Sequence, residues 1–443
     1  MRKGIGEEAE ETGIESLPSD SLLGRYVHRI RSFSLNAKLF LMAGILNGIS
    51  FGIWDTIFNL YLKWGLGFEA DFISQVISMS MFATGFVAIP AGLLCQGIGR
   101  KKSFLLGTFV SNLFVLAQIL TANRVLLLGS SLASGLFGTI SWVANAPFMM
   151  ENSQRDERTY LFSVSWALMT IFSLIGNLLG GFLPDSFAYV IGGAEAKILG
   201  YRLTLFFSIV CGLAALLPLS LIKERKVTNQ IEQPSFSLKG IKSYSVIFKL
   251  VLTAGLIGFG AGYIVPLFNV FFAGKFMATD EQVGVIFALG QIALTIGTLL
   301  APMISDKLGK VRVVVICQFV SIPFISLIAL SPTLELASSA YLARGTLMNM
   351  AGPVGSTFAM EIVKPTERAT TSGFQIMADN IPRAVGVILG GQIMSLGDYA
   401  SPFFFTSAFY LASCILYFIF FRKTERKITQ KKIEDSHAPD GEA

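Results

Sequence analysis

Long apolar segments alternate with short polar segments along most of the chain. A helix rises about 1.5 Å per residue and the hydrocarbon core of a bilayer is about 30 Å thick, so roughly 18 to 20 apolar residues cross it. Apolar segments of about this length or more lie at residues 38–62, 71–95, 104–121, 125–149, 160–183, 199–221, 246–272, 282–304, 313–331, 334–360, 368–396 and 402–421. The pattern therefore predicts twelve membrane-spanning segments in two sets of six.

Each of these segments is expected to be helical, because backbone groups in hydrocarbon have no water to bind and must be satisfied within the segment. Segments of this length do not fit the short alternating strands of an outer-membrane barrel. The composition agrees, since 53% of the residues are hydrophobic, 14% are charged and the mean hydropathy is +0.62, which is too apolar for a soluble protein of 443 residues. We therefore expect an all-α integral membrane protein.

The second half of the chain repeats the first at an offset of 210 residues, which carries Asn59 to Asn269 and Gly99 to Gly309. Other matched positions are Leu46, Gly48, Gly52, Gly176, Gly180 and Gly181, which meet Leu256, Gly258, Gly262, Gly386, Gly390 and Gly391. A duplicated set of spans is typical of secondary transporters, whose site lies between the halves. We expect two pseudo-symmetric six-helix bundles at residues 38–222 and 246–422, a linker at 223–245, and tails at 1–37 and 423–443, of which the last is charged and expected to be disordered.

Basic residues in the short loops predict the orientation, because Lys and Arg tend to stay on the cytoplasmic side. One side of the predicted membrane holds both tails and Arg100, Lys101, Lys102, Arg155, Arg158, Lys307, Lys310, Arg312, Lys364 and Arg368. We therefore expect a multi-pass protein of the cell (inner or plasma) membrane with both termini in the cytoplasm. This topology accounts for the net charge of +6, and no basic stripe with interleaved aromatic residues indicates nucleic-acid binding.

The four cysteines, Cys95, Cys211, Cys317 and Cys414, lie in or at the ends of different spans without paired spacing. This distribution predicts no disulfide framework and no metal site. Both histidines lie in the tails, and no HExxH, Walker or GxSxG motif is present, so that a membrane enzyme, a cofactor site and ATP-driven transport are not expected.

Two matching loops resemble a known family motif. The loop after the second span contains Gly92, Gln96, Gly99 and Arg100, and the loop after the eighth contains Asp306, Lys307, Gly309 and Lys310. These loops resemble the G-x-L-a-D-r-x-G-r-k loop of the major facilitator superfamily, whose fold has twelve spans in two six-helix bundles. The resemblance implies that the loops latch the halves together in the outward-open state, and Gln96 in place of the usual Asp implies a weaker first latch. A role in turn formation and topology alone is the alternative.

A second resemblance concerns the fifth span. Gly176, Asn177, Gly180 and Gly181 are similar to the G-P-x-x-G-G stretch of proton-coupled antiporters, with Asn177 in the place of Pro. Close packing of two helices at these small residues is the alternative interpretation.

Few ionisable residues lie within the spans, and such residues are costly in hydrocarbon and tend to mark functional sites. Asp55 lies in the first span, four residues before Asn59; Arg344 lies in the tenth; Gln375, Asp379 and Arg383 share one face of the eleventh. One interpretation makes Arg344 and Arg383 anchors for an anionic or polar group of a substrate, and Asp379 and Asp55 proton-coupling residues. The alternative is a permanent Asp379–Arg383 ion pair that fixes helix packing. Asp55 would then reach the outer headgroups or form a hydrogen bond with a neighbour such as Asn59.

A further repeated loop follows the fourth and the tenth spans. Glu151 and Arg158 in the first copy match Glu361 and Arg368 in the second. Salt bridges between these residues are candidates for an inner gate, and the duplicated spacing favours an architectural role over substrate binding.

We therefore expect a secondary active transporter of the major facilitator type, moving a small organic solute by alternating access. Proton coupling is expected, and export is favoured over uptake as a property of the family. The expected partners are the solute, protons and membrane lipids, with the chain acting as a monomer. A lipid or lysolipid flippase of the same fold and a channel-like facilitator remain alternatives.

Overall fold

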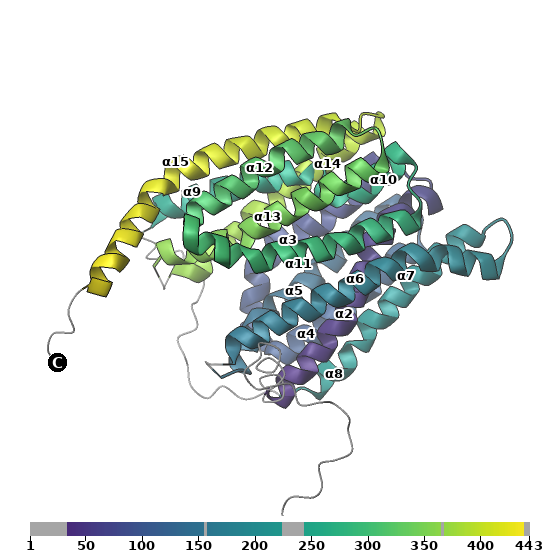
Figure 1. The fold of residues 1–443 in the computed structure, drawn as a ribbon. Helices are drawn as coiled ribbons and strands as arrows, with labels where there is room; N and C mark the ends of the chain where they lie inside the picture. Colours follow the sequence, from purple (N-terminus) through teal and green to yellow (C-terminus); the bar gives the residue numbers. More distant parts are fainter. Residues whose placement is uncertain (1–32, 155–156, 224–242, 365–366, 438–443) are drawn as a thin grey trace, which may run out of the picture.

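The computed structural model describes residues 33–154, 157–223, 243–364 and 367–437. Most of the N-terminal tail, most of the linker and Arg155 lie outside the described residues. The described part consists of helices and short connections without β-strands (Figure 1).

The described residues form twelve helical spans, as the sequence predicts. The first six are α2 (Leu35–Leu60) with the π-helical turn η1 (Tyr61–Gly65), α3 (Ala70–Ile98), α4 (Arg100–Leu120), α5 (Arg124–Glu151), α6 (Arg158–Ile191), and α7 (Ala196–Ala214) with α8 (Leu216–Leu221). The second six are α9 (Tyr244–Gly262) with the turn η2 (Val265–Leu267) and α10 (Phe268–Phe276), α11 (Asp280–Leu308), α12 (Lys310–Leu330), α13 (Leu334–Ile362), α14 (Arg368–Ser395) and α15 (Ser401–His437).

Ten of these spans in the described part are both long and apolar enough to cross a membrane. The other two are α13 and α14, which have 29 and 28 residues and are long enough to cross but more polar. These two helices carry Arg344, Asp379 and Arg383. The apolar pattern is therefore weakest where the charged residues lie.

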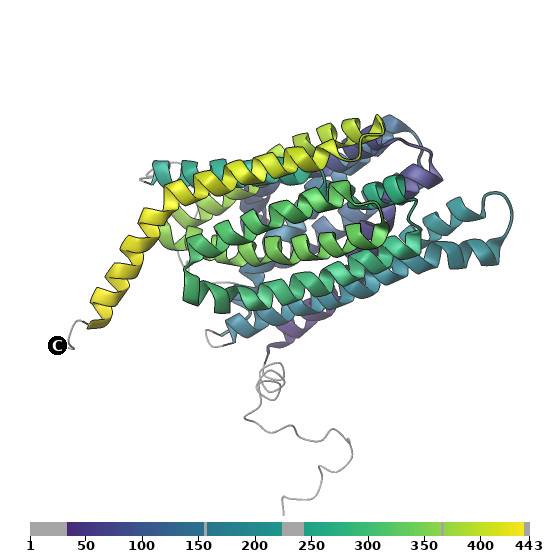
Figure 2. The ribbon, with the colours of Figure 1, turned by 45° about the horizontal axis from the view of Figure 1, so that its top comes forward.

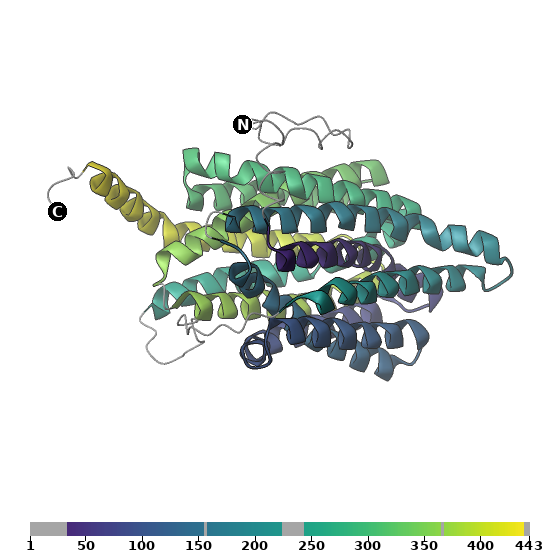
Figure 3. The ribbon, with the colours of Figure 1, turned by 90° about the horizontal axis from the view of Figure 1, so that it is seen from below.

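The spans run side by side and the two ends of the bundle differ. At one end, here called the hairpin end, α6 and α7 project beyond the other helices (Figures 2 and 3). At the opposite end, here called the tail end, α2 and α9 begin and α15 extends beyond the bundle (Figures 1 and 3). The two halves meet mainly where α3 packs on α14 and α6 packs on α11.

The last helix corrects one expectation. The tail from residue 423 was expected to be disordered, but α15 continues to His437. A helix makes its hydrogen bonds internally, and Lys, Arg, Glu and Gln are good helix formers, so that leaving the apolar region does not end it. The Glu425 carboxylate also accepts a hydrogen bond of 2.9 Å from the Val311 backbone N–H at the start of α12, which fixes this part of α15 to the bundle.

Two other spans differ from their predicted extent. The span predicted at 246–272 breaks between α9 and α10, because Pro266 has no N–H and cannot continue the helical hydrogen bonds. The span predicted to end at residue 183 continues through Pro184 to Ile191. There the Pro184 carbonyl lies so close to α7 that a Cβ on Gly200 would be 2.2 Å from it, so neighbouring packing supports the extended helix.

Glycines set the closest helix approaches in both halves. A Cβ on Gly52 of α2 would lie 2.1 Å from the Ser173 carbonyl oxygen of α6, and a Cβ on Gly176 would lie 2.3 Å from the Ile49 carbonyl oxygen. In the second half, a Cβ on Gly262 of α9 would lie 2.3 Å from the Arg383 carbonyl oxygen of α14. The glycines of the fifth span thus allow close packing of two helices, which was one of the two interpretations of that glycine-rich stretch.

The repeated loops turn at glycines with matching backbone conformations. Gly99 has a φ of 90° between α3 and α4, and Gly309 has a φ of 87° between α11 and α12. Such positive φ values are readily adopted only by glycine. These residues explain why the motif keeps a glycine at this position in both copies.

We expect Gly52→Ala to lower the thermal unfolding midpoint of the purified protein, because the new Cβ has no space beside Ser173. Overpacking of this kind costs about 1–3 kcal/mol. The matched control is Gly44→Ala on the same helix, where a Cβ meets no other atom within 4 Å. Equal midpoints for the two variants, followed by intrinsic fluorescence during heating, would contradict this account of the α2–α6 contact.

Candidate transport site

An ion pair lies within α14, one turn apart along the helix. The Arg383 guanidinium donates hydrogen bonds of 2.6 and 3.2 Å to the two carboxylate oxygens of Asp379. The two side chains keep 20% and 38% of their surface exposed, so the pair is not sealed from solvent or solute. The backbone beneath it is fixed by α9, since a Cβ on Gly258 would lie 2.4 Å from the Asp379 carbonyl oxygen. The pairing expected from the four-residue spacing is therefore present.

Arg344 of α13 joins the same region through α15. Its Nη2 donates a 2.8 Å hydrogen bond to the Tyr410 hydroxyl, and its guanidinium lies over the rings of Phe268 and Tyr410. Its Nε has no hydrogen-bond partner among the described residues, and only 7% of the residue is exposed. Tyr410 also lies within electrostatic range of Arg383. Tyr410 thus binds Arg344 near Arg383, and no feature of the apolar sequence around Tyr410 distinguished it beforehand.

Asp55 lies on α2, in the other half of the molecule. Its side chain is exposed although it belongs to a membrane span. It lies within electrostatic range of the Tyr341 hydroxyl on α13, and so does Arg344. Asp55 is thus placed across the junction of the halves from α13.

Asn59 has other partners than Asp55. Its side-chain amide donates 2.8 Å to the Asn269 side-chain oxygen and 2.9 Å to the Pro266 carbonyl oxygen. Asn269 in turn donates to the backbone carbonyl oxygens of Asp55 and Thr56, at 3.1 and 3.3 Å. Two residues at the same position of the repeat therefore meet each other and join the halves near the hairpin end.

An ion cluster at the hairpin end also joins the halves. Lys197 of α7 contacts Asp280 of α11 at 2.6 Å and also pairs with Asp185 of α6. The Tyr201 hydroxyl donates a 3.1 Å hydrogen bond to Asp280, of which 4% is exposed. Sequence reasoning missed this cluster, because its members lie in different helices and each one looked like an ordinary residue near a membrane surface.

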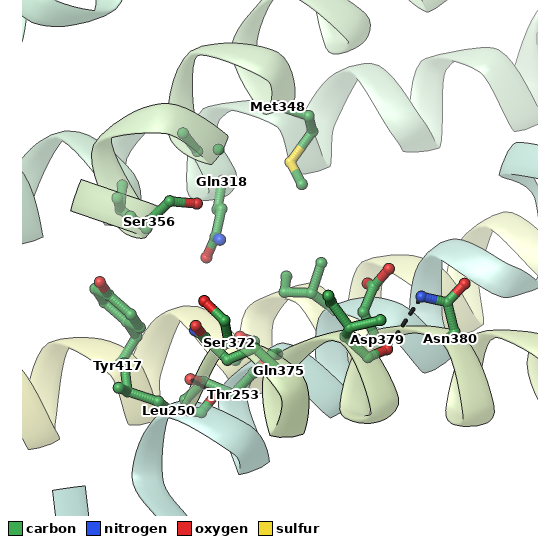
Figure 4. Close-up of a pocket in the computed structure, with 18 residues that line it drawn as sticks. Leu250, Thr253, Gln318, Met348, Ser356, Ser372, Gln375, Asp379, Asn380 and Tyr417 are labelled. Carbon is green, nitrogen blue, oxygen red and sulfur yellow. Dashed lines mark hydrogen bonds between the residues drawn. The ribbon is translucent and has the colours of Figure 1, made fainter. Parts of the chain in front are cut away.

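A cavity of about 540 Å³ lies in the second half, on the tail side of this region. It is formed by α9, α12, α13, α14 and α15, and its polar lining residues are Thr253, Gln318, Ser356, Ser372, Gln375, Asp379, Asn380, Ser413 and Tyr417. Figure 4 shows Asp379 and Asn380 at one end and Tyr417 at the other, with Gln318 and Met348 facing Ser372 and Gln375 across the space. Of the candidate residues, the structure thus places Gln375 and Asp379 at one cavity.

The repeated loops at the tail end are tied within each half. Arg100 pairs with Glu151 at 3.0 Å, and Lys310 pairs with Glu361 at 2.5 Å, which are matched positions of the repeat. Arg158 and Arg368 donate to the backbone carbonyl oxygens of Met150 and Met360, at 3.2 and 2.8 Å.

The remaining motif residues contribute little to these contacts. Gln96 and Lys307 are exposed, and a Cβ on Gly92 would have no other atom within 4 Å. The Asp306 side chain lies outside the described residues. The described contacts therefore support each loop from its own bundle.

Comparison with known proteins agrees with this architecture. The chain is 23% identical over 398 residues to a "Multi-drug resistance efflux pump PmrA homolog" from Lactococcus lactis, an alignment covering 86% of this chain and 93% of that protein. Among solved structures, a mutant form of the nucleoside transporter NupG has a TM-score of 0.72 at 15% identity, covering 87% of this chain and 100% of NupG.

Two further solved structures have the same fold. A bacterial homologue of the human lysosomal transporter Spinster, in an inward-facing and occupied conformation, has a TM-score of 0.70 at 14% identity, covering 86% of this chain and 95% of that one. A bacterial homologue of the iron transporter ferroportin, in an inward-facing state, has a TM-score of 0.69 at 12% identity, covering 86% and 97%.

The sequence profile of the Major Facilitator Superfamily matches the chain twice, at residues 40–268 and 250–440, so that both halves are included. Together with the twelve spans and the paired loops, this match establishes that the chain is a transporter of the major facilitator superfamily.

Proposed function

We propose that the chain is a proton-driven exporter of small organic solutes, and that these solutes bind through hydrogen-bond donors. In this proposal the tail end faces the cytoplasm, as the basic loops predict. The contacts between the halves at the hairpin end then close the outer side, and the conformation is open to the cytoplasm.

The observation that carries the proposal is the double role of Asp379. Its carboxylate is the partner of Arg383 and also lines the cavity. A solute hydroxyl or amine that donates to this carboxylate competes with a proton for the same oxygen atoms. Protonation at the outer face then releases the solute, which is the coupling that export driven by an inward proton gradient requires.

Two other charged residues have distinct parts in this proposal. Arg344 acts as a positioning residue, because its guanidinium is directed at Tyr410 and the cavity lining does not include it. Asp55 is a second proton site, in the half opposite to Asp379. Its backbone carbonyl accepts a hydrogen bond from Asn269 of the other half. Opening of the hairpin end would break this hydrogen bond and so change the surroundings of Asp55.

The relative from Lactococcus lactis supports export, since its name describes a multi-drug efflux pump. The hydrogen-bonding lining of the cavity supports a solute with polar groups.

We expect Asp379→Asn to reduce proton-driven ethidium accumulation in inside-out proteoliposomes at least about tenfold, because Asn keeps the shape of the side chain but cannot exchange a proton. Asp55→Asn should also uncouple transport. Lowering the pH should weaken ethidium binding to the native protein but not to Asp379→Asn. The control is Glu335→Gln, an exposed carboxyl near the hairpin end of α13.

Carboxyfluorescein serves as an anionic probe in the same vesicles. Movement of this anion together with protons, and none of ethidium, would contradict the proposal and favour binding at Arg383 after Asp379 is protonated. Unchanged coupling in both Asp379→Asn and Asp55→Asn would exclude these carboxylates as the proton sites.

The ion cluster of the hairpin end gives a separate test of the closed state. Asp280→Asn weakens the link between Lys197 and α11, so the hairpin end should open more often. We expect faster maleimide labelling of a cysteine placed at Ser74, which is fully buried against Gly391. Asp398→Asn, in the exposed loop before α15, is the control. An unchanged labelling rate for Asp280→Asn would show that this cluster does not hold the end closed.

A further inference from the structure

The cavity in the second half extends from α14 deep into the bundle. Gln318 on α12 and Ser413 and Tyr417 on α15 form its inner wall, behind the helices α13 and α14. The charged end of the cavity at Asp379 has a part in proton coupling under the proposed function. The inner wall has no part in that step. Ser413 donates a hydrogen bond of 3.1 Å to the Thr253 backbone carbonyl oxygen, but the Tyr417 hydroxyl has no partner among the described residues and calls for another explanation.

Tyr417 supplies the strongest sign of a bound group. Only 7% of the residue is exposed, and its hydroxyl has no hydrogen-bond partner among the described residues. Its ring packs against Phe358 and Phe421, with ring centroids 6.3 and 4.8 Å apart. A phenylalanine would make the same ring contacts without burying an unpaired hydroxyl, which is costly. A hydroxyl at this end of the cavity is therefore suited to a ligand (Figure 4).

Other lining groups are also available to a ligand. The Ser356 hydroxyl and the Gln375 amide make no hydrogen bond in the described part of the chain, although both face the cavity. Gln318 accepts a weak hydrogen bond from the Cys414 thiol at its side-chain oxygen, so that its NH₂ group remains available as a donor. These groups together offer both donors and acceptors without carrying a charge.

The first half of the molecule has apolar residues at several positions that match this polar lining. The positions 210 residues before Thr253, Ser356, Ser372 and Asp379 are Ala43, Ala146, Phe162 and Met169. The helices that carry these residues match in both halves, since α14 begins at Arg368 and α6 at Arg158. The scaffold therefore folds with apolar residues at these four positions, so the fold alone does not require polar side chains there.

We propose that the inner part of this cavity is a subsite for an uncharged, hydroxyl-rich portion of the transported solute, such as a sugar ring. Hydroxyls both donate and accept, as the side chains of Tyr417, Ser356, Gln375 and Gln318 do. The volume of about 540 Å³ lies within the usual range of about 300–1,000 Å³ for small-molecule sites. The inference rests on the proposed function in assigning the bound group to a transported solute.

The test uses the full chain in lipid nanodiscs and two neutral fluorescent probes, 4-methylumbelliferyl β-D-glucoside and 7-methoxy-4-methylcoumarin, which has the same ring system without the sugar. We expect the glucoside to bind at least about fivefold more tightly. Tyr417→Phe removes one hydrogen-bonding group and should weaken glucoside binding about 2- to 10-fold. It should leave the coumarin affinity unchanged and should not lower the thermal midpoint, because the hydroxyl has no partner among the described residues.

Ser372→Phe supplies a second variant, which places in the cavity the residue that the first half has at Phe162. We expect it to abolish glucoside binding by filling the space. Tyr263→Phe, a buried tyrosine near the hairpin end of α9 that does not line the cavity, is the matched control and should leave binding unchanged.

The outcomes separate this inference from the proposed function. Equal affinity for the two probes, or glucoside binding that neither Tyr417→Phe nor Ser372→Phe weakens, overturns the subsite. Proton-driven ethidium transport that persists in Tyr417→Phe then leaves the proposed function standing. Sugar-dependent binding that is lost in the variants, in a protein that shows no proton coupling, supports the subsite and overturns the proposed function.

Discussion

The close contact between α9 and α14 is the constraint on which the candidate site depends. Gly258 and Gly262 present bare backbone to α14, and the carbonyl oxygens of Asp379 and Arg383 occupy the space that side chains would take. The position of the ion pair is therefore set by its backbone rather than by the two charges. An ion pair in an apolar region contributes little stability after its desolvation cost, whereas glycine-mediated packing fixes both helices. The charges can then change their protonation or partners while the helices stay in place.

The same packing occurs in the first half with other consequences. Gly48 and Gly52 of α2 meet α6 as Gly258 and Gly262 meet α14, but α6 carries Met169 where α14 carries Asp379. The helix packing is thus the same in both halves, whereas the charged residue at this position is present in the second half alone. The cavity described above and the charged residues Arg344, Asp379 and Arg383 lie in the second half, while the first half contributes the charged residue Asp55 from across the junction.

Hydropathy predicted the spans because a bilayer imposes one length and one composition on every crossing helix. The Asp379–Arg383 pair was also predictable, since residues four apart share a helix face. Tyr410, Tyr417 and the Lys197–Asp280 pair were not, because their partners lie far away in sequence and their residue types are common in membrane proteins. Pro266 in the sequence indicated the break after α9, and the helix-forming charged residues indicated that α15 continues to His437. A span that is defined by apolar residues alone uses neither of these signals.

The Asn59–Asn269 contact has the geometry of an interface between identical subunits. Residues at one position of the repeat bind each other across the junction, as in an isologous dimer in which a surface patch meets its own copy. This contact therefore needs no difference between the halves, whereas the Lys197–Asp280 pair, the Asp379–Arg383 pair and the polar cavity require that the two copies, once joined in one chain, diverge.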